Sequence, residues 1–184
     1  IIGYGPNPRE CCDIVRDNKI YSICGNHDSA CYDDSLIDYF NPLAREAIIW
    51  TRSQLTQDYL DYLRRLPFED VLYGFRIVHG APGEPFEYIT TIQDARAAFI
   101  SFDEDVCFIG HSHIMEYFEL KKGSVIIRQL PLRNKQELSL EEDKRYIINT
   151  GSVGQPRDGD PRSACVIYDT SEKRLTAHRV PYKI

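Results

Sequence analysis

The sequence lacks the features that mark several specialised classes of protein. No apolar run approaches the roughly 18 residues that a membrane-spanning helix needs, and no secretory signal peptide is visible. Its 184 residues contain no internal repeat and no low-complexity tract. The formal net charge is −6, so the chain has no excess of basic residues for broad contact with nucleic-acid phosphates. We therefore expect a cytoplasmic, globular protein without membrane or broad nucleic-acid binding.

The six cysteines show no pairing typical of a metal or redox site. None of them forms a C-x-x-C motif, which argues against a zinc ribbon and a redox dithiol. Cys107 and Cys165 lie in apolar runs and are interpreted as small core residues. The adjacent Cys11 and Cys12 cannot easily bond to each other. We predict reduced thiols, as is usual in the cytosol.

Hydrophobic periodicity predicts helices and strands in alternation early in the chain, and mostly strands later. Helices are predicted from residue 7 and over residues 42–55, 56–66 and 91–101. Strands are predicted over residues 19–24, 71–78 with a break near Gly74, 106–109, 117–120, 124–130, 145–149, 164–169 and 175–180. Residues 132–144 are predicted as a surface loop. The pattern indicates a mixed α/β chain without a domain boundary.

Four of the five histidines stand at the ends of predicted strands, close to glycine: His27, His79, His111 and His113. Strand ends gather at one rim of a sheet, where sites in α/β folds tend to lie. His178 stands apart, within a strand candidate. A lone histidine is more often a surface or core residue than a ligand, but four at strand ends predict one shared site.

His111 and His113 are two residues apart. In an extended segment such residues point to the same side, so both imidazoles are expected to face one pocket. Gly110 lets the backbone approach closely. Imidazole, together with carboxylate and amide oxygens, suits Zn, Mn, Fe, Ni or Co. Taken alone, the motif is equally consistent with a polar turn.

The motif Gly25-Asn26-His27-Asp28 adds different chemistry. The side-chain oxygen of Asn26 is a neutral, hard ligand. A His27 that does not bind the metal is free to give or take a proton. A hydrogen bond from the His27 imidazole to the Asp28 carboxylate would favour the charged imidazolium of His27. The alternative is an ordinary polar turn.

Together the three motifs, Gly25-Asn26-His27-Asp28, Val78-His79-Gly80 and Gly110-His111-Ser112-His113, resemble those of the calcineurin-like metallophosphoesterases in order and rough spacing. The small bacterial and archaeal phosphodiesterase branch is the closer match, also through residues 3–8, 40–42 and 149–157. The resemblance covers essentially the whole chain. It implies one α/β domain over residues 1–184, a four-layer sandwich of two facing mixed β-sheets flanked by helices.

The resemblance also implies roles for the site residues. Asn26, His79 and His111 would bind one divalent metal ion and His113 a second, the ions being Mn, Fe, Ni or Zn. A hydroxide bridging the ions would attack the phosphorus of a small phosphoester or nucleotide, with His27 as the general acid beside Asp28. Two ions about 3.5–4 Å apart lower the pKa of bound water and stabilise both reacting oxygens.

Two further motifs of the family, Asp-x-His and Gly-Asp, are not present upstream of Gly25 in this sequence. The resemblance places both upstream of Gly25, and the second directly before Ile1. We therefore expect the sequence to begin partway through the natural protein and to lack its N-terminal strand and first metal-binding motifs. As it stands, the chain is expected to bind one metal ion better than two.

Residues 149–162 are rich in Gly, Asp and Arg. One interpretation is a long surface loop. The other is that Arg157 or Arg162 reaches a substrate phosphate, which a guanidinium binds in a bidentate manner. The resemblance places this loop near the site, which favours the second interpretation. Tyr4 is expected either to stack on a substrate base or to pack.

Two other functions compete with a phosphodiesterase or phosphatase. The first is a protein-binding scaffold that keeps the phosphoesterase fold without catalysis. His27 argues against it, because a scaffold does not need a general acid beside intact ligands. The second is a protein Ser/Thr phosphatase, for whose substrate groove the chain is short. The sequence leaves the physiological substrate open, and it is compatible with an oligomer.

Overall fold

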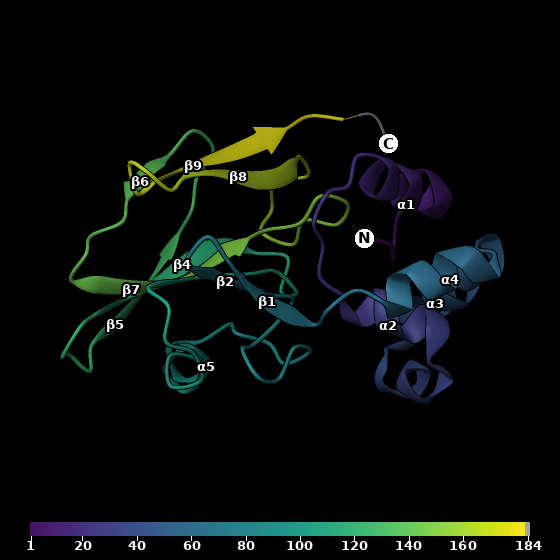
Figure 1. Ribbon diagram of the computed structural model, residues 1–184, viewed down its shortest axis with the longest axis horizontal. Coiled ribbons are helices and arrows are strands. Elements are labelled where there is room, and N and C mark those ends of the chain that lie inside the picture. Colours follow the sequence, from purple (N-terminus) through teal and green to yellow (C-terminus); the bar gives the residue numbers. More distant parts are fainter. Residues whose placement is uncertain (183–184) are drawn as a thin grey trace. The chain divides into compact units, whose positions relative to one another are not determined.

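The computed structural model describes residues 1–182 and divides the chain into two compact units, Ile1–Phe68 and the part that begins at Glu69 (Figure 1). Four α-helices belong to the first unit, and two β-sheets with a fifth helix belong to the second. Hydrophobic patterning gives no sign of a division after residue 68. The single domain expected over residues 1–184 stays a prediction, since one domain can contain two such units.

The first unit is helical. Its elements are α1 (Pro8–Asp17), α2 (Asn26–Tyr32), a short 3-10 helix (Asp34–Tyr39), α3 (Pro42–Gln54) and α4 (Gln57–Arg64). Pro8 and Pro42 open their helices, where the missing N–H is not needed. Ala30, Cys31 and Ile48 form a small buried core. The three helices predicted in this part of the chain are therefore confirmed.

The strand predicted over residues 19–24 is wrong. Lys19 has a left-handed backbone with φ of +52°, and the side chains of Ile20 and Tyr21 are 51% and 52% exposed. No strand of the described residues pairs with this segment, although the N–H of Cys24 donates to the carbonyl of Pro67 at 2.7 Å. The apolar run suggested a buried strand, but a strand also needs a neighbour to satisfy its backbone groups.

The larger sheet of the second unit has six strands in the order β1-β2-β3-β7-β4-β5. They are β1 (Glu69–Leu72), β2 (Phe75–Val78), β3 (Val106–Ile109), β4 (Met115–Lys121), β5 (Ile127–Pro131) and β7 (Lys144–Thr150). β3 runs parallel to β2 and β7, and the other pairs are antiparallel. Tyr73 and Gly74, with φ of +49° and +82°, form the two-residue turn between β1 and β2. The predicted break near Gly74 is confirmed.

The smaller sheet is antiparallel, with the order β6-β9-β8. Its strands are β6 (Glu137–Ser139), β8 (Ser163–Asp169) and β9 (Arg174–Val180). β6 lies within residues 132–144, which were predicted as a loop, so that prediction is wrong for this stretch. Leu138 is the only apolar residue of β6, and one residue cannot produce an alternating pattern.

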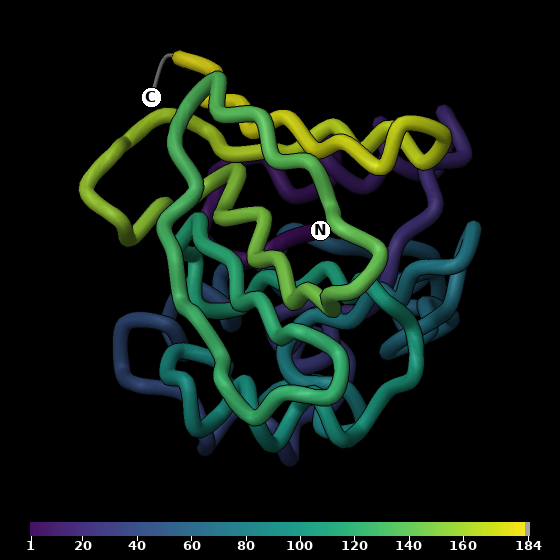
Figure 2. The backbone as a smooth tube through the Cα atoms, turned by 90° about the vertical axis from the view of Figure 1, so that its left-hand side faces the viewer, coloured from purple at the N-terminus to yellow at the C-terminus, as the bar shows by residue number. Residues whose placement is uncertain are grey.

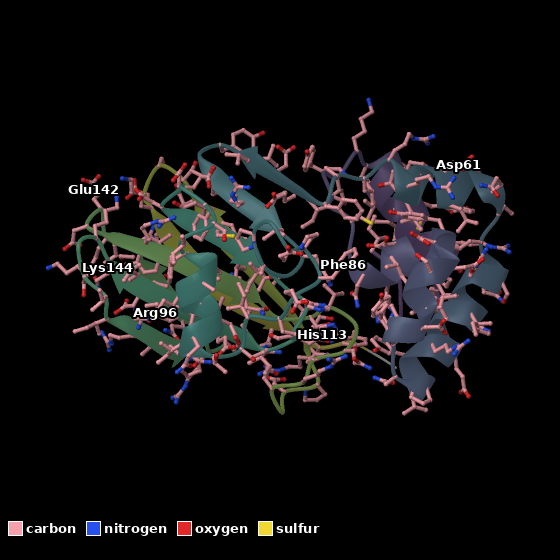
Figure 3. The ribbon with its side chains drawn as sticks, turned by 90° about the horizontal axis from the view of Figure 1, so that it is seen from below. Asp61, Phe86, Arg96, His113, Glu142 and Lys144 are labelled. Atoms are coloured by element: carbon pink, nitrogen blue, oxygen red, sulfur yellow. The ribbon has the colours of Figure 1, made fainter. Side chains whose placement is uncertain are left out.

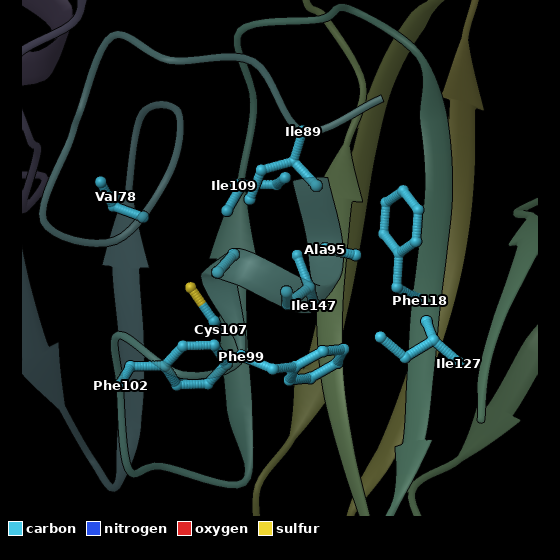
Figure 4. Close-up of a cluster of buried hydrophobic side chains, with 11 residues drawn as sticks. Val78, Ile89, Ala95, Phe99, Phe102, Cys107, Ile109, Phe118, Ile127 and Ile147 are labelled. Atoms are coloured by element: carbon cyan, nitrogen blue, oxygen red, sulfur yellow. The ribbon is translucent and has the colours of Figure 1, made fainter. Parts of the chain in front are cut away.

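The second unit has three layers: the smaller sheet, the larger sheet and helix α5 (Ile92–Ala98), as Figures 1 and 2 show from two sides. One core cluster, which includes Ile147, fills the space between α5 and the larger sheet (Figure 4). A second cluster, which includes Tyr146 and Ile148, packs against the smaller sheet. Successive side chains of β7 thus point to opposite faces of the larger sheet, as they do in any β-strand. The predicted α/β fold of two sheets flanked by helices is confirmed, although the smaller sheet is antiparallel and not mixed as expected, and this unit has three layers.

All six cysteines are free thiols. Burial raises the pKa of the Cys12 and Cys24 thiols to about 11 and that of Cys31 to about 12, which keeps these thiols protonated and unreactive. Cys107 is buried as predicted, whereas Cys165 is exposed and is not a core residue. None of the helices within residues 1–182 has both the length and the apolar character needed to cross a membrane.

Candidate functional site

Three of the predicted ligands lie at one edge of the larger sheet. The parallel strands β2, β3 and β7 end at the same edge, with His79 directly after β2. His111 and His113 lie between the end of β3 and the start of β4. In Figure 3, Phe86 and His113 lie toward one end of this unit, and Glu142 and Lys144 lie at the other. The predicted position at strand ends is therefore confirmed for these three histidines.

His79 and His111 are in direct contact. Nδ1 of His111 lies 3.1 Å from Nε2 of His79. Burial lowers the pKa of His111 to about 4, and the charges of His113 and Arg157 act in the same direction, whereas a hydrogen bond with the Phe86 backbone opposes them. His111 is therefore neutral at pH 7, which is the form of imidazole that binds metals.

The spacing of these two nitrogens fits a shared metal ion. Two imidazole nitrogens that each bind a tetrahedral zinc ion at ~2.0–2.1 Å are separated by about 3.3 Å. The observed 3.1 Å is close to that separation. His79 and His111 therefore fit two adjacent ligand positions of an ion. Within residues 1–182, no group of three or more His, Cys, Asp or Glu side chains is placed to hold an ion, so these two histidines form only part of a site.

A backbone carbonyl fixes the tautomer of His113. Nδ1 of His113 lies 2.8 Å from the carbonyl oxygen of Gln155. Because a carbonyl can only accept, Nδ1 carries the proton and Nε2 carries the lone pair. Burial lowers the pKa of His113, and the Arg157 charge contributes. A neutral imidazole oriented by a backbone carbonyl is typical of a metal-binding histidine.

The backbone of the histidine loop, residues 110–113, is not extended. His111 and His113 have left-handed φ angles of +60° and +62°. The expectation that an extended segment turns both imidazoles to one side is therefore wrong, because the chain bends here. Nor does Gly110 make the expected close approach: a Cβ at this position would meet its nearest atom at 3.7 Å. Left-handed residues other than glycine cost about 1–3 kcal/mol each, so other contacts must hold the loop.

Asn149, near the end of β7, supplies those contacts. Its Nδ2 donates to the carbonyl of Gly110 at 2.6 Å and to Oγ of Ser112 at 2.8 Å. Its Oδ1 accepts the N–H of Gly151 at 3.0 Å. Asn149 is fully buried, so each polar atom needs such a partner. Sequence reasoning assigned it no role, although a polar residue at the end of an apolar strand is a usable signal.

The loop after β7 lies against the histidine loop. The N–H of Arg157 donates to the carbonyl of His113 at 3.1 Å, and the N–H of Met115 donates to Asp158 at 3.0 Å. The exposed Arg157 guanidinium donates to Oε1 of Gln155 at 2.8 and 3.1 Å. This position beside His113 agrees with the expected position near the site. The contact of Arg157 with a substrate stays a prediction.

The Gly25-Asn26-His27-Asp28 motif is the start of helix α2, in the first unit, and the preceding residues 1–24 contain no strand, so the expected strand-end position of His27 is wrong. Gly25 is the N-cap, and Asn26 and His27 lie in the first turn. The buried Asp28 carboxylate accepts the N–H of Gly25 at 2.9 Å and that of Ile2 at 3.0 Å. The bond from Gly25 helps to explain the helix, since it satisfies the N–H of the N-cap residue. The proposed bond between Asp28 and His27 stays a prediction.

His27 lies between two aromatic rings of the first unit. The centroid of its ring is 4.5 Å from that of Tyr4 and 5.1 Å from that of Phe40. Gly3 packs behind it, since a Cβ at that position would come within 3.1 Å of the imidazole. The structure thus brings Tyr4 and His27 together, as expected of two residues in one site. The roles of Asn26, His27 and Tyr4 in that site stay predictions.

Comparisons with known proteins agree with these features. Residues 2–173 match the family model of the calcineurin-like phosphoesterase superfamily domain. An uncharacterized protein from Methanocaldococcus jannaschii is 34% identical over 188 residues, which cover 100% of this chain and 74% of that protein.

Two solved structures are similar as well. The crystal structure of a metallophosphoesterase from Sphaerobacter thermophilus has a TM-score of 0.85 at 39% identity, with 100% of this chain and 75% of that chain covered. A hypothetical protein from Pyrococcus horikoshii shares the fold, with a TM-score of 0.72 at 17% identity over 100% of this chain and 73% of that one. Together with the family model, these matches show that the chain belongs to the calcineurin-like phosphoesterase superfamily.

Proposed function

We propose that this protein hydrolyses small phosphoesters, such as nucleotides, with divalent metal ions bound in part by its strand-end histidines. The observation that supports this most is the 3.1 Å contact between His79 and His111. Asn26 would join this pair around one ion, and His113 would bind a second. Members of the family generally bind divalent metals. Nitrogen and amide-oxygen ligands favour Mn, Fe, Ni or Zn among them.

The bound ions supply Lewis acidity toward the phosphoryl oxygens and make water more acidic. The residues of the chain supply the rest. Burial keeps His111 neutral, and Gln155 holds the proton of His113 on Nδ1. His27 holds a proton for the leaving oxygen, because an alkoxide is a poor leaving group. Arg157 offers a guanidinium to a phosphate oxygen.

Hydrolysis that depends on added metal ions is the first expected result. The full-length protein would be freed of metal with a chelator and assayed with bis(4-nitrophenyl) phosphate and 4-nitrophenyl phosphate. We expect no turnover before, and clear turnover after, addition of Mn²⁺, Fe²⁺, Ni²⁺ or Zn²⁺. The ratio of the two rates then distinguishes a phosphodiesterase from a phosphomonoesterase. Absence of turnover with every ion would refute the proposal and favour the protein-binding scaffold.

Replacement of Arg157 by alanine is expected to raise KM about 10- to 100-fold, because hydrogen bonds to a charged group contribute roughly 1.5–3 kcal/mol. The matched control is Arg162→Ala, since the Arg162 guanidinium already pairs with Asp160 at 2.6 Å in the same loop. Steady-state kinetics on the diester and the monoester measure both variants. If Arg157→Ala leaves KM and kcat unchanged on both, Arg157 does not bind the phosphate.

A further inference from the structure

An aromatic side chain covers His111. Tyr88 lies in the loop between β2 and α5, and its ring stacks on the imidazole of His111 with 3.9 Å between centroids and 15° between planes. Tyr88 is 48% exposed, whereas His111 is 6% exposed. The tyrosine therefore shields the histidine from water while part of its own ring stays in contact with solvent.

The backbone of this loop explains why Tyr88 lies there. A Cβ at Gly80 would lie 2.3 Å from the carbonyl oxygen of Glu87 and 2.8 Å from that of Pro85. No side chain fits in that space, so glycine at position 80 lets the loop fold back onto the end of β2. The backbone of Gly80 lies close to that of Glu87, which directly precedes Tyr88. This contact therefore helps to fix the position of the Tyr88 ring.

The far end of the loop is fixed as well. Ile89 is 2% exposed and belongs to the core cluster under α5. Nε2 of Gln129 donates to the carbonyl of Thr90 at 3.0 Å and to the carboxylate of Glu116 at 2.8 Å. Tyr88 is thus held from both sides by backbone and core contacts. Its place over His111 does not depend on burial of its own ring.

A stacked ring restricts χ2, the torsion that sets the plane of a metal-binding histidine. The χ2 angle of histidine has broad minima, so an unsupported imidazole turns easily about this bond. A parallel ring at 3.9 Å blocks that rotation, and aromatic pairs contribute about 0.5–1.5 kcal/mol beyond the area that they bury. The restriction keeps Nδ1 of His111 directed at Nε2 of His79.

We propose that Tyr88 is a positioning residue for metal binding: its ring fixes the plane of the His111 imidazole, so that His79 and His111 converge on one divalent ion. This inference rests on the proposed function, in which His111 is a ligand. Tyr88 itself does not bind the metal. The aromatic ring, and not its hydroxyl group, carries the effect.

The experiment measures the affinity of the full-length, metal-free protein for Mn²⁺ by titration calorimetry and by electron paramagnetic resonance of free Mn²⁺. Tyr88→Ala is expected to bind Mn²⁺ about 10- to 100-fold more weakly, the loss typical for residues that orient a ligand. Tyr88→Phe keeps the ring and should retain wild-type affinity. The matched control, Tyr73→Ala, removes an exposed ring in the turn between β1 and β2 and should change nothing.

Wild-type affinity in Tyr88→Ala would overturn the inference, and so would equal losses in Tyr88→Ala and Tyr88→Phe. If Tyr88→Ala lowers the unfolding temperature of the metal-free protein, Tyr88→Leu takes its place, because leucine keeps bulk without a planar ring. The same weakened binding is expected of it, and unchanged binding would again overturn the inference. A wild-type protein that binds none of Mn²⁺, Fe²⁺, Ni²⁺ and Zn²⁺ would instead refute the proposed function together with this inference.

Discussion

His111→Ala is expected to abolish metal-dependent hydrolysis. The substitution removes one of two imidazole nitrogens that lie 3.1 Å apart and leaves His79 without its partner. Replacing a residue that only orients a metal ligand typically lowers metal affinity 10- to 100-fold. Replacing the ligand itself should therefore lower the affinity by more than about 100-fold. Activity at a fixed Mn²⁺ concentration should fall by at least that factor.

The left-handed backbone of His111 calls for a second variant. With φ of +60°, position 111 suits glycine, which adopts this backbone conformation without strain. His111→Gly therefore removes the imidazole without offering another ligand and should lose Mn²⁺ binding as His111→Ala does. His178→Ala serves as the control, because His178 lies in β9, in the smaller sheet. Wild-type Mn²⁺ affinity in both position-111 variants would exclude this histidine as a ligand.

The strand-end histidines could be predicted because their signal is local. His79 and His111 each follow a short apolar run that ends near glycine, and parallel strands bring such ends to one edge. The conformation of the loop could not be predicted in the same way. The loop that carries the left-handed His111 and His113 is held by hydrogen bonds from Asn149, which is distant in the sequence, to Gly110 and Ser112.

The role of Tyr88 was equally invisible in the sequence. One tyrosine in a loop rich in Pro and Gly has no periodicity, and its contact with His111 exists only because Gly80 allows the loop to fold back. The informative residue is Gly80, which in the sequence belongs to the Val78-His79-Gly80 motif. A glycine directly after a strand-end histidine marks a close approach of backbone, but its partner cannot be identified without coordinates.

Strands could be predicted where alternating apolar residues face a hydrophobic core and the strand has a neighbour with which to pair. β7 alternates between two cores, and its predicted range of 145–149 agrees with the observed Lys144–Thr150. Residues 19–24 have a comparable apolar content but no paired strand within residues 1–182, and they form none. The start of α2 was missed because Asn, His and Asp are typical of turns. The cap formed by Asp28 and Gly25 outweighs that preference.

His27→Ala should affect substrates according to their leaving groups. If His27 gives its proton to the leaving oxygen, its loss should lower kcat about 10²- to 10⁴-fold for an alkyl ester, whose alkoxide must be protonated. A 4-nitrophenyl ester should suffer far less, because 4-nitrophenolate leaves readily without a proton. His27 lies between Tyr4 and Phe40, so His27→Gln is the companion variant that refills most of this space.

The measurement compares kcat for methyl and 4-nitrophenyl esters of the same phosphate, together with Mn²⁺ affinity. A general acid predicts that the His27 variants bind Mn²⁺ as the wild type does and lose activity selectively on the methyl ester. Asn26 stands beside His27 in the first turn of α2, so a shift of this turn is the competing explanation. That shift would weaken Mn²⁺ binding and lower both rates by the same factor. Equal losses on the two esters would therefore reject His27 as the acid and assign its effect to the position of Asn26.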